Sequence, residues 1–256
     1  MSVTKSVYEG VKHVVVDNLG SGSIIVEPGT GQDLVESSID AADERFIEQM
    51  QIHHDHDWLR MSFPQQLFRH TKAHLRLAVP DGLTFVIKTG SAGVSISAAI
   101  GRSKIISGSG DITIGNAVDL DCNTGSGDIS VARVDGSAAR LNSGSGDISI
   151  SEAYCPLTAK SGSGDVVAKS VQDDLRANSG SGDIGIASTS GSVDLRSASG
   201  SLTVGVADEL PAWLDLSSVS GDIRIGLEST AQPGPGERYI SVRARTASGD
   251  IAIHRA

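Results

Sequence analysis

Seven aspartates recur at a nearly constant spacing, and they are the first residues in the sequence that could carry chemistry. Each follows glycine in a copy of Ser-Gly-Ser-Gly-Asp or of a shorter form: Asp111, Asp128, Asp147, Asp165, Asp183, Asp222 and Asp250. If the copies stack, the carboxylates form a line about 4.8 Å apart, at which like charges repel. Calcium, which prefers oxygen ligands, could neutralise them, and Asp111, Asp128, Asp147, Asp165 and Asp183 are its candidate ligands. Backbone N–H groups of the turns are the alternative partners, and we expect this structural role.

A histidine-rich segment, His53-His-Asp-His-Asp57, is the second candidate metal site. Imidazole and carboxylate groups bind zinc or nickel, and His54 and His56 would share a face if the segment is a strand. His70 and His74 follow in the sequence. The alternative is a solvated hairpin tip between residues 50–52 and 58–61. Because no second motif has ligand spacing, we expect the hairpin tip and no cofactor, with calcium as the one alternative.

The sequence has no motif that indicates catalysis. Serines are abundant but repetitive, and no Gly-x-Ser-x-Gly nucleophile elbow occurs. The Gly-x-Gly segments precede strands, whereas phosphate-binding loops of this kind precede helices. A glycosidase or lyase would need a cluster of carboxylates that differs from the repeat. We therefore expect no enzymatic activity.

The aspartates belong to a repeat that extends from about residue 85 to the C-terminus. With the Asp position as reference, successive copies are 17 to 19 residues apart, and two late gaps are 21 and 28. Aliphatic residues stand one and three positions after the reference and six and eight before it, with mostly polar residues between them. This alternation indicates two short half-buried strands per copy, and the glycines disfavour helices. Strands that return at a fixed period stack in parallel, so the sequence predicts an all-β, parallel β-solenoid.

We expect about nine coils with a period of about 18 residues in residues 81–256, and an irregular β-rich region in residues 1–80 that caps the solenoid. A right-handed coil is predicted from the preference of parallel crossovers. The region from 41 to 52 could be helix or strand, and the other strands expected before the repeat are 11–16, 23–26, 33–39, 58–63 and 74–79.

Finer expectations concern the corner of each coil and the end of the solenoid. Ser or Thr four positions before the reference and Ser two before it should both face inward, and the glycine before Asp should supply the dihedral angles of a bend. The last copy, residues 248–256, should form the exposed end, which self-association could cover.

Composition excludes some partners and compartments. The 256 residues carry a net charge of −10, which argues against a nucleic-acid or anionic-membrane surface. Met1–Glu9 has no apolar leader and no apolar run reaches 18 residues, so we expect a cytoplasmic protein without a transmembrane segment. Cys122 stands in an aliphatic column and Cys155 in a turn, and both are expected to be reduced thiols.

The chain resembles the bacterial putative-adhesin family of unknown function with β-strand repeats. The resemblance includes the lead-in Leu75-Arg-Leu-Ala-Val-Pro80-Asp-Gly82, the Ser-Gly-Ser-Gly-Asp-Ile copies and the final Ala247-Ser-Gly-Asp-Ile-Ala-Ile253. It implies the solenoid fold and, from the adhesin label, surface exposure. Some relatives resemble accessory proteins of envelope-stress regulation. The family supplies no catalytic or ligand residues that could be transferred.

We therefore expect a non-catalytic, bacterial repeat scaffold or interaction module. It would bind a protein partner through polar solenoid faces with ladders of Asn, Arg, Thr and Ser, which include Arg140 and Arg176. The first alternative is a putative adhesin or carbohydrate-binding module at the cell surface. The second is a hydrolase or lyase on a β-helix scaffold.

Overall fold

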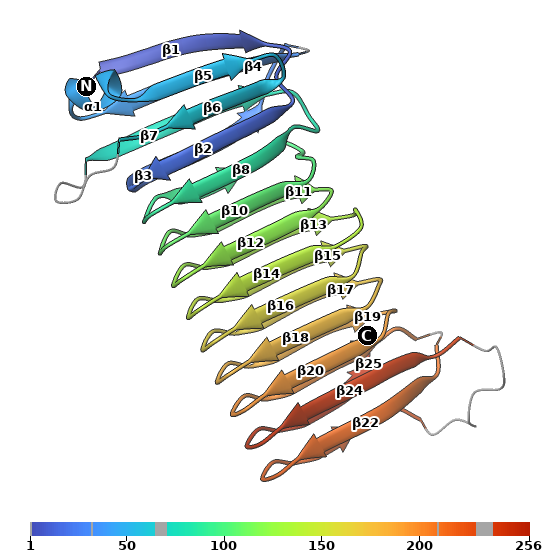
Figure 1. The fold of residues 1–256 in the computed structure, drawn as a ribbon. Helices are drawn as coiled ribbons and strands as arrows, with labels where there is room; N and C mark the ends of the chain where they lie inside the picture. Colours follow the sequence, from blue (N-terminus) through green and yellow to red (C-terminus); the bar gives the residue numbers. More distant parts are fainter. Residues whose placement is uncertain (1, 32, 65–70, 209, 229–237) are drawn as a thin grey trace. The chain divides into compact units, whose positions relative to one another are not determined.

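The computed structural model describes residues 2–31, 33–64, 71–208, 210–228 and 238–256. It is almost entirely β-structure, with one short helix, α1 (Glu44–Glu48). The chain divides into two compact units, residues 1–130 and 131–256, which are described separately below. The fold class predicted from the repeat is confirmed, since parallel strands stack at the period of the sequence (Figure 1).

In unit 1 the repeat strands form two parallel stacks. One stack contains β8, β10 and β12, and the other contains β9 and β11. Ile87, Ile105 and Cys122 lie side by side in the first stack and are fully buried. The bounds of these strands are β8 (Thr84–Thr89), β9 (Gly93–Ile96), β10 (Ser103–Ser107), β11 (Ile112–Ala117) and β12 (Leu120–Thr124).

The region before the repeat extends both stacks. β2 (His13–Leu19) pairs in parallel with both β6 (Trp58–Ser62) and β8, and β3 (Ser21–Pro28) pairs with both β7 (Lys72–Val79) and β9. Antiparallel strands follow: β4 (Leu34–Ala41) lies between β1 (Ser2–Glu9) and β7, and β5 (Gln51–Asp55) lies on β6. Residues 41–52 thus hold both a helix and the start of a strand. A capping role of residues 1–80 stays a prediction.

Unit 2 begins within β13 (Ile129–Val134) and also has two parallel stacks. The first stack, in spatial order, is β14 (Ala139–Ser143), β16 (Leu157–Ser161), β18 (Leu175–Ser179), β20 (Val193–Ser197), β24 (Ile240–Thr246) and β22 (Ala212–Ser218). The second is β15 (Ile148–Ala153), β17 (Val166–Val171), β19 (Ile184–Thr189), β21 (Leu202–Val206), β25 (Ile251–Arg255) and β23 (Ile223–Ile225). The aliphatic columns of both stacks meet in a thin core between them.

The order of the last two coils differs from the sequence-based expectation. The final copy, β24 and β25, lies inside, paired on one side with β20 and β21 and on the other with β22 and β23. Its aliphatic residues are almost fully buried, whereas Ile223 and Ile225 of β23 are 42% and 53% exposed. The earlier coil therefore forms the edge, and the final copy occupies the interior. Self-association through this edge stays a prediction.

The corner of each coil also differs in part from the expectation. In the coils with the full Ser-Gly-Ser-Gly-Asp or Thr-Gly-Ser-Gly-Asp motif, the Ser or Thr four positions before Asp is buried as predicted, but the Ser two before it is exposed, and the glycine directly before Asp is buried in its place. This glycine does not have a positive φ. In Gly164 and Gly182 an added Cβ would instead overlap the carbonyl oxygen of the corresponding glycine one coil earlier. Close approach of two backbones, and not an unusual dihedral angle, requires glycine here.

Both cysteines are free and buried. Burial raises the pKa of the Cys122 thiol, and the nearby Asp121 carboxylate adds to this shift. Since the thiolate is the reactive form, neither thiol of the folded protein should react with a thiol reagent. We expect two thiols to become reactive only in denaturant, measured by absorbance after labelling. Rapid labelling of Cys122 under native conditions would contradict the described core.

Candidate functional site

The repeated aspartates make hydrogen bonds between coils. An oxygen of Asp147 accepts from the backbone N–H of Asp165 at 2.8 Å, Asp165 accepts from Asp183 at 2.8 Å, and Asp183 accepts from Ser201 at 2.7 Å. In unit 1, Asp111 accepts from Asp128 at 3.0 Å. Each of these bonds fixes a turn against its neighbour and offsets part of the repulsion between the carboxylates. Sequence reasoning predicted turn N–H partners but not that they belong to the next coil. Calcium binding by these aspartates stays the alternative to the structural role that we expect.

The histidine-rich segment forms the antiparallel hairpin of β5 and β6. His54 lies in β5 with its ring 5.6 Å from that of Tyr8, and His56 lies in the turn with a φ of 52°. The Nδ1 atom of His56 is 2.6 Å from Asp55. His74 contacts Ser23 at 2.8 Å, and His70 lies outside the described residues. Within the described ranges, no three His, Cys, Asp or Glu side chains are grouped to hold a metal ion.

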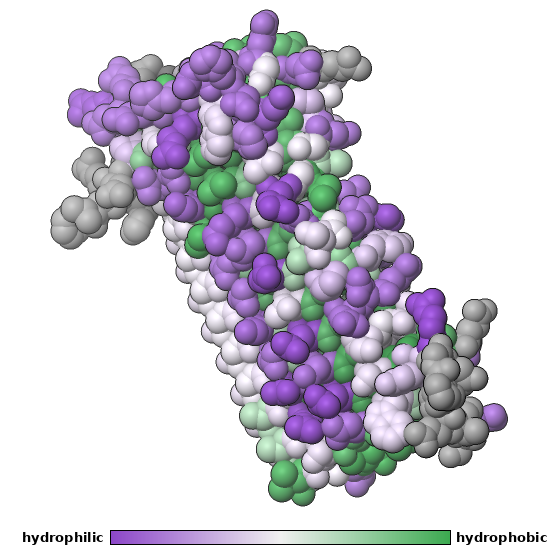
Figure 2. Space-filling view, turned by 45° about the vertical axis from the view of Figure 1, so that its right-hand side comes forward, coloured by the Kyte–Doolittle hydropathy of each residue, from purple (hydrophilic) through white to green (hydrophobic). Residues whose placement is uncertain are grey.

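The outward side of the first stack of unit 2 concentrates positive charge. We call its two columns of outward residues on β14, β16, β18, β20, β24 and β22 the cationic face. The first column, in spatial order, is Arg140, Thr158, Arg176, Asp194, Arg243 and Asp215, and the second is Asn142, Lys160, Asn178, Arg196, Arg245 and Ser217. The two columns together contain six cations and only two carboxylates, although the whole chain has a net charge of −10. Figure 2 shows strongly hydrophilic side chains gathered over this part of unit 2.

The two carboxylates hold some of these cations in place. Asp194 receives two hydrogen bonds from Arg196, at 3.2 and 3.1 Å, and lies 4.0 Å from Arg176. Asp215 accepts from Arg243 and from Arg245, each at 3.0 Å. The bond from Arg243, followed by that from Arg245, lowers the pKa of Asp215 below its ordinary value.

Two cations are not engaged in this way. Arg140 and Lys160 are exposed, and within the described part of the chain neither has a carboxylate within 4.0 Å. Their charges are therefore available to a ligand.

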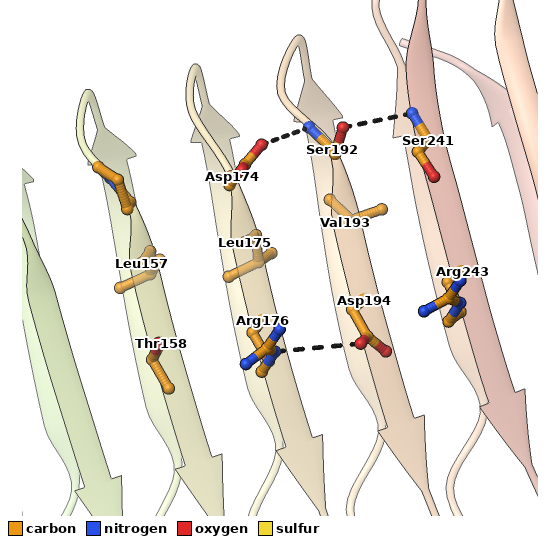
Figure 3. Close-up of a pocket in the computed structure, with 11 residues that line it drawn as sticks. Leu157, Thr158, Asp174, Leu175, Arg176, Ser192, Val193, Asp194, Ser241 and Arg243 are labelled. Atoms are coloured by element: carbon orange, nitrogen blue, oxygen red, sulfur yellow. Dashed lines mark hydrogen bonds and ion pairs between the residues drawn. The ribbon is translucent and has the colours of Figure 1, made fainter.

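A shallow groove of about 320 Å³ crosses the start of the strands on the cationic face (Figure 3). Asp174 accepts a hydrogen bond from the Ser192 N–H at 3.3 Å, and the Ser192 hydroxyl accepts from the Ser241 N–H at 3.4 Å. Thr158, Arg176 and Arg243 lie along the same strands. The groove thus offers two guanidinium groups, two carboxylates and several hydroxyls, a polar set that suits hydrogen bonds to a hydroxylated ligand.

The outward side of the second stack has a different character. Its central column is Ser149, Val167, Gly185, Thr203, Ala252 and Arg224. Apart from Arg224 at the edge, this column carries no charge, and the exposed Lys169 lies outside it, so cations are fewer here than on the cationic face.

Sequence reasoning recognised Arg140 and Arg176 as outward residues but not the cationic face. The signal was available: the positions seven and five before Asp carry the cations in successive copies. The overall negative charge concealed it, because net charge does not describe where charges lie.

No helix among the described residues is long and apolar enough to span a membrane.

No curated protein matches the chain. Solved structures that resemble it include a putative adhesin from Bacteroides fragilis, with 13% identity, coverage of 98% of this chain and 97% of that chain, and a TM-score of 0.47. A putative lipid binding protein from Parabacteroides distasonis has 13% identity, coverage of 98% and 96%, and a TM-score of 0.47. The family model described as Toastrack DUF4097 matches residues 48–254, and the chain therefore belongs to that family of β-strand repeat proteins.

Proposed function

We propose that the chain is a non-catalytic interaction module that binds an extended acidic partner through the cationic face. The observation that carries the proposal is the concentration of six cations, with two carboxylates, on one side of unit 2. A repeat protein is suited to this role because its regular stack presents a long, rigid surface. The cytoplasmic location expected from the sequence is the alternative to a location in the envelope or the medium, and fractionation of native cells tests between them.

The absence of catalysis is part of the proposal. The two columns of the cationic face have two carboxylates, and both are engaged by arginines; the further carboxylate of the groove, Asp174, accepts a hydrogen bond from the Ser192 N–H. An acid–base pair for hydrolysis would need one carboxylate kept protonated and one left free to act.

The test is binding of the full-length protein to a panel of polyanions at several salt concentrations. We expect binding that weakens as salt rises, as electrostatic attraction requires. Charge reversal of Arg140 and Arg176 together should reduce affinity at least about tenfold, because two attractions become repulsions. Lys169 is exposed on the opposite stack, so Lys169→Glu is the matched control and should bind normally. Absence of binding to every polyanion, or equal loss in the control, would refute the proposal.

A further inference from the structure

The cations of the cationic face alternate between its two columns. Each of five neighbouring strands carries at least one cation: Arg140 in the first column, Lys160 in the second, Arg176 in the first, Arg196 in the second, and then Arg243 and Arg245 in both. Neighbouring strands are about 4.8 Å apart, and residues two apart on one strand are about 6.6 Å apart. The positive charges therefore form a zigzag with a step of one strand.

From this zigzag we infer that the ligand of the cationic face is a linear acidic polysaccharide made of uronic acid units. The inference rests on the proposed function and names the ligand class of the same surface. In an extended polyuronate ribbon each sugar carries one carboxylate, and successive sugars turn their carboxylates to opposite sides. The length of one pyranose unit along the polymer is close to the distance between neighbouring strands. Each successive carboxylate therefore meets the cation of the next strand, in the column on its own side of the ribbon.

The other side chains of the face fit such a ligand. Guanidinium groups bind carboxylates through paired hydrogen bonds, and four of the five strands carry at least one arginine. Thr158 and Asn178, which alternate with the cations, offer hydrogen-bonding groups for sugar hydroxyls. Trp213, 55% exposed on β22, lies beside Ser241 of the groove and provides a flat surface for a sugar ring.

An acidic peptide fits the spacing less well. In an extended peptide, side chains on one side recur about every 6.6 Å, whereas the alternating cations of one column recur on every second strand, about 9.6 Å apart. A single-stranded nucleic acid needs several aromatic side chains for base stacking, and no described residue of the two columns is aromatic; Trp213 and Tyr239 lie beyond one end of them.

A membrane surface also fits poorly, because it is broad. The turns at the two ends of these strands carry Asp174 and Asp183, which a flat anionic surface would approach. A narrow chain that follows the two columns meets Asp174 where it crosses the groove, but it does not cover the turn that carries Asp183.

Asp194 competes with the ligand in this arrangement, because it holds Arg196 through two hydrogen bonds. Asp194→Asn should therefore raise the affinity for polyuronate severalfold, whereas a merely structural role of the pair predicts unchanged or weaker binding.

The experiment compares four soluble probes on the full-length protein by calorimetry at fixed ionic strength. These are polymannuronate oligomers, neutral mannan oligomers of equal length, polyglutamate and oligothymidylate. We expect polymannuronate to bind at least about tenfold more tightly than the other three, and Lys160→Glu with Arg196→Glu to abolish this preference. Lys169→Glu should preserve it.

The outcomes separate the two proposals. If polyglutamate or oligothymidylate binds as tightly as polymannuronate, the ligand class is wrong while the cationic face remains a binding surface. If none of the acidic probes binds, both proposals fail. Binding of neutral mannan as tightly as polymannuronate would also overturn the inference, because charge would then play no part.

Acidic polysaccharides of this kind occur in the cell envelope and the medium. The inference and the expected cytoplasmic location are therefore incompatible, and fractionation of native cells distinguishes them. Recovery of the protein with the envelope or medium is expected, and its exclusive recovery with the cytosol would overturn the inference.

Discussion

Gly164→Ala is expected to destabilise the protein by about 3 kcal/mol, the upper end of the usual cost of overpacking. Gly164 is buried at the corner of its coil, and a Cβ at this position would overlap the carbonyl oxygen of Gly146. Neither backbone can retreat without breaking the hydrogen bond from the Asp165 N–H to Asp147, which joins the same two turns. Denaturant unfolding followed by circular dichroism measures the difference in the free energy of unfolding.

Gly185→Ala is the matched control. Gly185 lies in β19, has an ordinary φ, and has open space where its Cβ would lie. Alanine at this position should leave the free energy of unfolding unchanged or raise it by up to about 1 kcal/mol, because alanine gives the unfolded chain less conformational entropy than glycine does. Equal destabilisation by both substitutions would show that the corner does not depend on close approach of the two backbones.

Ser179→Ala is expected to cost about 2 kcal/mol. The buried Ser179 hydroxyl accepts a hydrogen bond from the Gly182 N–H at 2.9 Å and donates one to the Gly164 carbonyl at 3.0 Å. Alanine would leave a buried donor and a buried acceptor without this partner, which typically costs 1–3 kcal/mol. Thermal and denaturant unfolding should both show the loss.

Ser181→Ala separates this role from a general effect of serine in the turn. Ser181 is two positions further along and is exposed, so its replacement should change stability by less than about 0.5 kcal/mol. A similar cost for the two alanine variants would mean that the bridging hydroxyl of Ser179 is not what stabilises the corner.

The aliphatic columns made the coil predictable from the sequence. Leu175 and Ala177 on one strand and Ile184 and Ile186 on the next are apolar at alternate positions, and the structure buries all four. This pattern determines which residues face the core, since a slip by one residue would expose every one of them. It does not determine the direction in which a side chain points within a tight corner, so the inward orientation predicted for Ser181 was wrong.

The order of the terminal coils could not be predicted in the same way. Val242 and Ile251 fit their columns beside Val193 and Leu202 just as Leu214 and Ile223 would have done. The choice depends on how well a whole coil covers its neighbours, a property that no single copy displays.

The candidate site was predictable only in part. Arg176 and Arg140 were expected on an outward face because they alternate with buried residues. Only the pairing of the strands places Lys160 and Arg196 on the same face as these two arginines. The hydrogen bonds from Arg196 to Asp194 depend on side-chain positions that the sequence does not contain.

The most direct test of the account is to locate the bound ligand on the protein. Backbone amide chemical shifts of the full chain would be followed by NMR during titration with the tightest-binding polyanion. We predict shifts at the amides of β14, β16, β18, β20 and β24, in proportion to saturation. Shifts concentrated on β15, β17, β19 and β21, with the cationic face unchanged, would contradict the central claim that this face is the binding surface.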